Sequence, residues 1–419
     1  MNLIRFPKYL KDLSREEGFV CAVFLLIPLA GQRLFGTPLY PLDILAFLLI
    51  LFSLMRREGF RDGVLRVWHQ EKALVFGTLL FLVGTLLAFF THERTLTGWG
   101  ELKSWILVPL SIFLATASLK ERIRPMFLWL AWLAMTAILA SVSLWGWFNN
   151  FLTFDGRLAY PENSPNFLAE LLAPGLLLCF FFGSRFLRKN ILFVFLPFLL
   201  LIPFLATRSY GAWLAFFLAA FSLFLSLRLK GRGIHLLLLS VFFSIAIFGF
   251  YEIRTDKFTA LSHLEERSSL ASRIMIWKSA ASMLHDEPFL GIGLGRFQTV
   301  YLEKQSEFPP YLEWAVPEPH NFFLSVWLSS GLLGLLGMLV LLWWTAQNLF
   351  FLFRAHSSGA ALLLSLSLFL LVFGFFDTPF FRNDLSVLFF LFLLLVLLEK
   401  TRLTDREGGQ AARLRKVNG

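Results

Sequence analysis

The sequence predicts an all-α integral membrane protein with about twelve transmembrane helices and a large helical loop between the ninth and the tenth. Two properties indicate this fold class. Hydrophobic residues make up 57% of the 419 residues and charged residues only 16%, which is typical of membrane proteins. The apolar residues also fall in repeated runs that are long enough to cross a hydrocarbon core of about 30 Å. We therefore expect one helical bundle.

Twelve apolar runs are candidate spans when the chain is read in windows of about 19 residues. In chain order they are 18–31, 38–55, 73–90, 99–118, 125–147, 166–183, 190–206, 210–227, 234–251, 333–353, 359–376 and 385–399. The first run follows a basic segment and lacks a small-residue cleavage site. We interpret it as an uncleaved helix and not as a signal peptide.

The distribution of Lys and Arg orients these helices. If the N-terminus is cytoplasmic, most basic residues lie on the cytoplasmic face, and the other face carries more acid than base, as the positive-inside rule requires. Both termini are then cytoplasmic, and the net charge of +10 reflects topology. The basic residues are dispersed among short loops, so no nucleic-acid surface is indicated.

The predicted organisation has four parts. Residues 1–251 hold the first nine helices, 252–332 form a long loop on the outer face with the candidate site motifs, 333–399 hold the last three helices, and 400–419 form a basic cytoplasmic tail. The outer face of the membrane also receives shorter polar segments, at 148–166, 207–211 and 377–384. Long loops of this kind are usually functional.

The long loop contains a predicted surface helix, "SSLASRIMIWKSAASMLHDEP". Serines suited to cap a helix precede it, apolar residues follow at helical spacing, and Pro288 ends it. The next stretch, "GIGLG", has three glycines that allow tight turns. Without a strand before it and a helix after it, this pattern indicates a structural turn more than a phosphate-binding loop.

Arg208 and His320 are the most informative single residues. Each is charged or titratable and lies at the outer boundary of an apolar run, where an arginine could snorkel to lipid phosphates and a histidine could cap a helix. Arg208, His320 and Arg273 are all predicted on the outer face of the membrane, which favours a shared functional site there. Other candidates on that face are Arg157, Tyr160, Asn163 and Asn166. No acidic cluster accompanies them, so neither a metal nor another cofactor is expected.

At these residues the chain resembles the O-antigen ligase and Wzy-type polymerase superfamily of bacterial envelope glycosyltransferases. The segments that carry the resemblance are "YPENSPNFLAELL", "TRSYGAWLA", "RIMIWKSAASMLHDEPFLGIGLGRF" and "PHNFFLSVWLSSGLLGLLG". The resemblance implies an undecaprenyl-diphosphate-linked glycan as donor and a periplasmic site without metal. It also implies that Arg208 and Arg273 bind the diphosphate and that His320 is the catalytic base. Trp277 and Asn321 are possible supporting residues.

The chemistry of the residue types agrees with that resemblance. Cleavage of a sugar–diphosphate bond releases a polyanion, which planar arginine forks can stabilise. A neutral imidazole can accept the proton of an attacking sugar hydroxyl. Direct attack by one hydroxyl would invert the anomeric centre.

Three functions remain as hypotheses. The first is an O-antigen ligase of the bacterial inner membrane, which joins the glycan to lipid A–core. The second is a Wzy-type repeat-unit polymerase, whose acceptor is another lipid-linked glycan. The third is a polytopic transporter. The substrate site of a transporter should lie near the membrane midplane, whereas the candidate residues of this chain lie at the outer boundary. The expected partners are the two lipid-linked substrates and membrane lipids.

Overall fold

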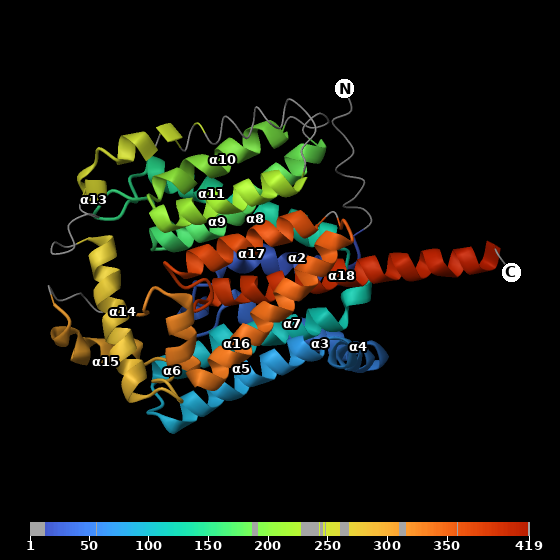
Figure 1. Cartoon of the computed structure of the whole chain (residues 1–419), viewed down its shortest axis with the longest axis horizontal. Coiled ribbons are helices and arrows are strands. Elements are labelled where there is room, and N and C mark those ends of the chain that lie inside the picture. Colours follow the sequence, from blue (N-terminus) through green and yellow to red (C-terminus); the bar gives the residue numbers. More distant parts are fainter. Residues whose placement is uncertain are drawn as a thin grey trace.

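The computed structural model describes residues 13–55, 57–186, 192–227, 249–259, 268–309, 316–357 and 359–417, together with residues 243, 246 and 247. Regular structure in these ranges is helical, apart from one bridge that pairs Leu152 with Leu158. Figure 1 shows long helices side by side, with α14 and α15 across one end and α18 projecting from the other. We call these the site end and the tail end.

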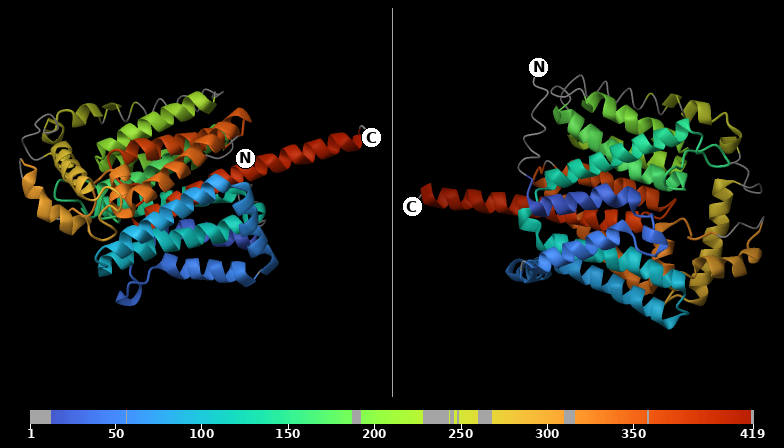
Figure 2. Two further views of the ribbon diagram at one scale, coloured as in Figure 1. Left: turned by 60° about the horizontal axis from the view of Figure 1, so that its bottom comes forward. Right: turned by 180° about the vertical axis from the view of Figure 1, so that it is seen from behind.

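The helices before the long loop are, in chain order, α2 (Arg15–Leu26), α3 (Pro41–Met55), α4 (Arg57–Gln70), α5 (Lys72–Thr91), α6 (Leu96–Glu101), α7 (Val108–Ser118), α8 (Pro125–Phe148), α9 (Pro165–Phe186), α10 (Leu192–Ala206) and α11 (Tyr210–Leu227). The later ones are α13 (Asp256–Thr259), α14 (Ser269–Asp286), α15 (Phe297–Lys304), α16 (Phe322–Arg354), α17 (Ala360–Gly374) and α18 (Asn383–Val417). A π-helical segment, Leu102–Leu107, joins α6 to α7. The two views of Figure 2 show the same parallel arrangement from below and from behind.

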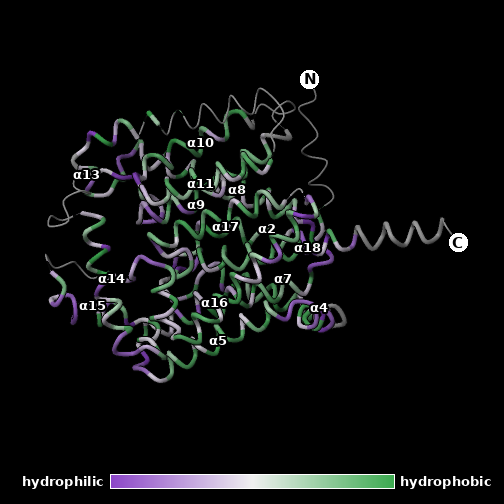
Figure 3. The backbone as a smooth tube through the Cα atoms, viewed as in Figure 1, coloured by the Kyte–Doolittle hydropathy of each residue, from purple (hydrophilic) through white to green (hydrophobic). Residues whose placement is uncertain are grey.

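Six helices in the described ranges are long and apolar enough to cross a membrane. They are Lys72–Thr91, Leu96–Ser118, Pro125–Phe148, Pro165–Gly183, Tyr210–Leu227 and Phe322–Arg354. Shorter apolar helices lie at Pro41–Met55, Val194–Ala206 and Ala360–Gly374. Hydrophobic residues follow the helices, while hydrophilic residues gather toward the two ends of the bundle (Figure 3). The predicted all-α fold is thus confirmed for the described residues, the six candidate spans support a membrane protein, and the number of twelve spans stays a prediction.

Several predicted boundaries differ from the structure. The run at 333–353 belongs to α16, which begins at Phe322 because Asn321 caps it: the Asn321 side chain accepts from the Leu324 N–H. The expected cytoplasmic loop after 55 contains the polar helix α4, and the expected tail continues α18 as helix to Val417. Most of the predicted span 234–251 lies outside the described residues.

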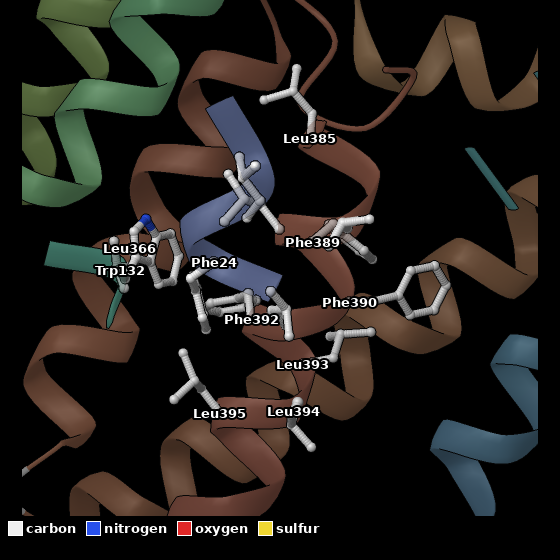
Figure 4. Packing of buried hydrophobic residues seen from close by; sticks show 14 of the residues in the cluster. Phe24, Trp132, Leu366, Leu385, Phe389, Phe390, Phe392, Leu393, Leu394 and Leu395 are labelled. Carbon is white, nitrogen blue, oxygen red and sulfur yellow. The ribbon is translucent and has the colours of Figure 1, made fainter. Parts of the chain in front are cut away.

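The core is built around the first half of α18. Its residues from Leu385 to Leu398 are buried almost without exception, and a helix that is apolar all round belongs inside a bundle. Figure 4 shows Phe24 of α2, Trp132 of α8 and Leu366 of α17 among the α18 side chains such as Phe392. Helices from both halves of the chain therefore share one core.

The glycine-rich turn 291–295 is packed into the site end. All three of its glycines have φ between 65° and 78°, the left-handed region that favours glycine. A Cβ at Gly291 would meet the Leu328 carbonyl, and one at Gly295 would meet the backbone of Gly98. The Gly295 N–H donates to Glu101 Oε2 at 2.6 Å, and the Gly293 N–H to the Leu328 carbonyl at 3.0 Å. These contacts favour the structural turn over a phosphate-binding loop.

Glycines also bring α5 and α16 into backbone contact. A Cβ at Gly84 would meet the backbone of Gly334, and a Cβ at Gly337 would meet the backbone of Phe81. Small residues at such crossings let transmembrane helices approach closely, so that van der Waals packing replaces a hydrophobic driving force. This pair of helices connects the site end to the tail end.

We expect Gly84→Ala to lower the free energy of unfolding by about 1–3 kcal/mol, because the added methyl must push α16 away. Thermal unfolding of the purified protein in detergent measures this. The control is Gly100→Ala in α6, where a Cβ has no neighbour within 4 Å; it should be neutral or stabilising by up to about 1 kcal/mol. Equal midpoints for the two variants would contradict the close α5–α16 contact.

Candidate functional site

His320 and Asp377 form a side-chain pair at the site end. The Nδ1 atom of His320 lies 3.1 Å from Oδ1 of Asp377. His320 precedes α16, and Asp377 lies between α17 and α18. The carboxylate is 1% exposed, whereas the imidazole is 30% exposed. An Nδ1–H that donates to the carboxylate leaves Nε2 of the partly exposed ring as a proton acceptor.

Asp377 is held by further contacts. Its Oδ2 accepts from Asn166 Nδ2 at 2.7 Å, and its Oδ1 accepts from the Thr378 N–H at 3.0 Å. Nη2 of Arg273 lies 3.9 Å from Oδ2. Burial raises the pKa of Asp377, but His320, Arg273 and the Thr378 N–H outweigh burial and hold that pKa below its usual value. Asp377 is therefore an ionised carboxylate that faces the histidine.

The backbone of His320 is fixed from both sides. The residue has φ 49°, an uncommon conformation for a side chain other than glycine. Trp277 Nε1 of α14 donates to the Pro319 carbonyl at 3.0 Å, directly before the histidine. Asn321, directly after it, caps α16 and donates from Nδ2 to the Phe375 carbonyl at 3.3 Å. The predicted supporting residues Trp277 and Asn321 thus orient His320.

Arg273 connects α14 to the segment that carries Asp377. Its Nε donates to the Phe376 carbonyl at 2.8 Å, and its Nη1 donates to the Ser269 carbonyl at 3.2 Å. Burial lowers the pKa of Arg273; the Asp377 charge opposes this, and the Arg157 charge adds to the lowering. The structure therefore brings Arg273 and Arg157 to the region of His320, as the sequence predicts.

Arg208 also has φ 49° and lies between α10 and α11. Its Nε is 2.6 Å from Oε1 of Glu252, whose Oε2 accepts from the Tyr210 hydroxyl at 2.7 Å. The next residue, Ser209, donates from Oγ to Asn166 Oδ1 at 2.9 Å. Because Asn166 also binds Asp377, hydrogen bonds link the Arg208 turn to the histidine pair.

Two of the predicted supporting residues have other surroundings. Tyr160 packs against the rings of Trp145 and Phe151, in an aromatic cluster at the start of the segment that precedes α9. Asn163 is exposed in a turn, with φ 60°. Arg157 pairs with Asp155 at 2.6 Å. These contacts shape the segment, and Asn166 at its end is the residue that touches Asp377.

The acidic residues of the site were not predicted from the sequence. No acidic cluster was expected beside the basic residues, whereas the structure places Asp377 against His320 and Glu252 against Arg208. A signal was present for Asp377, which starts the short outer segment 377–384 directly after an apolar run. Within the described ranges, no group of three or more His, Cys, Asp or Glu side chains is arranged to hold a metal ion. The carboxylates serve as partners of cations.

Glu318 is a second buried carboxylate near the histidine pair, two residues before His320 in the chain. It is 9% exposed, and its carboxylate accepts from the Thr378 hydroxyl. Burial raises the pKa of Glu318 well above its usual value; Thr378 opposes this, and the charges of Asp377 and Glu101 add to the rise. Glu318 and Asp377 therefore have opposite pKa shifts, and only Asp377 faces a cation.

Comparison with known families supports the resemblance seen in the sequence. Residues 193–339 match the family model described as O-Antigen ligase. This segment contains Arg208, Arg273 and His320, whereas Asp377 lies beyond it. No curated protein matches the chain. The match covers residues 193–339 of the 419-residue chain, and it supports a resemblance to the O-antigen ligase and Wzy superfamily.

We expect Glu318→Gln to raise the thermal unfolding temperature at pH 8 and to change it little at pH 4. A raised folded-state pKa stabilises the native state below the unfolded-state pKa of about 4.3, and this contribution is lost as the pH rises toward the folded-state value. Glutamine does not have this pH-dependent loss, so the gain over the wild type should grow with pH.

Thermal unfolding at several pH values measures the gain, with Glu303→Gln, at an exposed position of α15, as the control. A gain that is the same at every pH would mean that the pKa of Glu318 is not raised in the folded protein.

Proposed function

We propose that the chain is a glycosyltransferase that moves a glycan from a lipid diphosphate to a hydroxyl group of an acceptor, and that it acts as an O-antigen ligase. The observation that carries this proposal is the pairing of His320 with Asp377 beside Arg273 at one end of an apolar bundle. The matched family supplies the substrate class, because its members are glycosyltransferase-like enzymes for O-antigen.

His320 acts as general base in this proposal. As the acceptor oxygen attacks the anomeric carbon, Nε2 accepts the hydroxyl proton, and the bond between that carbon and the diphosphate oxygen breaks with its electron pair on the diphosphate. Asp377 holds the ring in the required tautomer and stabilises the imidazolium. One direct displacement inverts the anomeric centre.

Arginines stabilise the leaving diphosphate. Arg208 and Arg273 each present planar N–H groups, which suit phosphate oxygens. In the structure Arg208 lies against Glu252 and Arg273 against Asp377, so each arginine already holds an anionic group. No step of this displacement requires a metal or another cofactor.

An apolar cavity supports a lipid-linked donor. It has a volume of about 430 Å³ and lies between α11, α16, α17 and α18. Its lining runs from Phe322 and Pro379, each two residues from a member of the histidine pair, to Phe350 and Phe353 near the tail end of α16. A hydrocarbon chain in this cavity would leave its diphosphate at the site end.

The location and the acceptor complete the proposal. We assign the chain to a bacterial inner membrane, with the site end periplasmic and both termini cytoplasmic, and lipid A–core as acceptor. A repeat-unit polymerase would use the same chemistry with a second lipid-linked glycan as acceptor. Reconstitution in liposomes with an undecaprenyl-diphosphate glycan and either acceptor decides between them, because only the productive pair yields a new glycosidic bond.

We expect His320→Asn to lower turnover by about 10²-fold or more, because asparagine tolerates positive φ but is not a proton acceptor of this kind. Asp377→Asn should lower turnover by at least about 10-fold, since it favours the wrong tautomer. The assay measures glycan transfer at saturating substrates, with EDTA added to one arm.

Wild-type turnover in the His320→Asn protein would exclude the base assignment. Loss of wild-type activity with EDTA, restored by magnesium, would exclude the metal-free mechanism. Unfolding temperatures close to that of the wild type are required for each variant.

A second expectation concerns the cavity. Ser367 lines it on α17, and Ser367→Phe should raise the KM for a long-chain polyprenyl donor about 10-fold or more, with a smaller effect on a short-chain donor, because the ring occupies the space of the chain. Ser141→Phe on the exposed face of α8 is the control, since both serines donate to the carbonyl four residues earlier. An equal effect on both donors would show that the chain lies elsewhere.

A further inference from the structure

We propose that Glu252 is a positioning residue that fixes the guanidinium of Arg208 for the donor diphosphate. This inference rests on the proposed function, and it adds a residue from the start of the long loop, outside the turn that carries Arg208. Neither the sequence patterns nor the family resemblance pointed to Glu252.

The contacts of Glu252 use both of its carboxylate oxygens. Oε1 lies 2.6 Å from Arg208 Nε, and Oε2 accepts from the Tyr210 hydroxyl at 2.7 Å. The hydroxyl of Thr255 lies 3.4 Å from Oε2 and donates to the Glu252 carbonyl at 2.7 Å. The carboxylate is 1% exposed and the arginine side chain 25% exposed. A buried anion thus faces the Nε edge of a cation that reaches solvent.

Arg208 and Arg273 are held in different ways. Arg273 is oriented by two main-chain carbonyls, those of Phe376 and Ser269. Arg208 follows a helix end in a left-handed conformation, and its ion pair crosses to a separate segment of the chain. An arginine side chain loses considerable rotamer freedom when it binds a ligand. Glu252 removes part of that freedom before the diphosphate arrives, which favours binding.

The two possible roles of Glu252, offsetting the charge of Arg208 or orienting its guanidinium, predict opposite effects of Glu252→Gln on anion binding. If Glu252 only offsets the charge of Arg208, removal of its negative charge should strengthen the binding of an anion. If Glu252 orients the guanidinium, the weaker amide contact should release the side chain and weaken binding. The Arg208–Glu252 contact is a close ion pair without hydrogen-bond geometry, and we expect its loss to change the affinity for diphosphate about 10-fold.

The test titrates inorganic diphosphate into the purified full chain in nanodiscs and measures its dissociation constant. We expect Glu252→Gln to weaken binding about 10-fold and Tyr210→Phe, which removes one contact of Glu252, to weaken it about 3-fold. The matched control is Glu162→Gln: Glu162 is 6% exposed and pairs with Arg382, which is 22% exposed, so a similar ion pair is lost elsewhere. The control should bind like the wild type.

The same variants are then assayed for glycan transfer. Glu252→Gln should raise the donor KM and leave the acceptor KM unchanged, a split that general destabilisation would not produce. Tighter or unchanged diphosphate binding in Glu252→Gln would overturn this inference and leave the proposed function intact. Wild-type protein that fails to bind diphosphate, or binds it equally with Arg208→Gln, would overturn the diphosphate assignment itself. If Glu252→Gln does not fold, the dissociation constant of diphosphate for Tyr210→Phe tests the inference instead.

Discussion

The contact between His320 and Asp377 is the interaction on which the site depends. It joins the residue before α16 to the connection between α17 and α18, and Asn166, Thr378 and Arg273 all bind the same carboxylate. Three separate parts of the chain therefore meet at one buried anion. A buried carboxylate is costly without partners, so the cations and N–H groups around Asp377 stabilise both the fold of the loop and the tautomer of the histidine.

The fold could be predicted well where hydrophobic runs decide it. A run such as 125–147 has the length of a span and few charges, and α8 occupies almost the same residues. Hydropathy could not show that α16 starts at Phe322, because the polar cap Asn321 and the glycine kink at Gly331 interrupt the apolar signal. It also could not show α4, whose stability as a helix does not require an apolar run.

The site could be predicted in part, because a guanidinium or an imidazole at a membrane boundary stands out in an apolar sequence. Arg273, His320 and Asn166 lie on one face as the sequence suggested, and the structure shows that they meet at Asp377. Their acidic partners could not be assigned, since a carboxylate in a polar loop has no periodicity and its partner depends on tertiary packing. Tyr160 shows the reverse error: it stood beside the right motif, yet its ring belongs to an aromatic cluster.

The central place of α18 has a consequence for biogenesis. Every other described helix precedes α18 in the chain, yet side chains of α2, α8 and α17 pack around it, and Asn383 Nδ2 at its start donates to the Ala30 carbonyl at 3.3 Å. The core seen in the structure is therefore complete only after α18 has been synthesised and inserted, so the final packing of the earlier helices follows their own insertion.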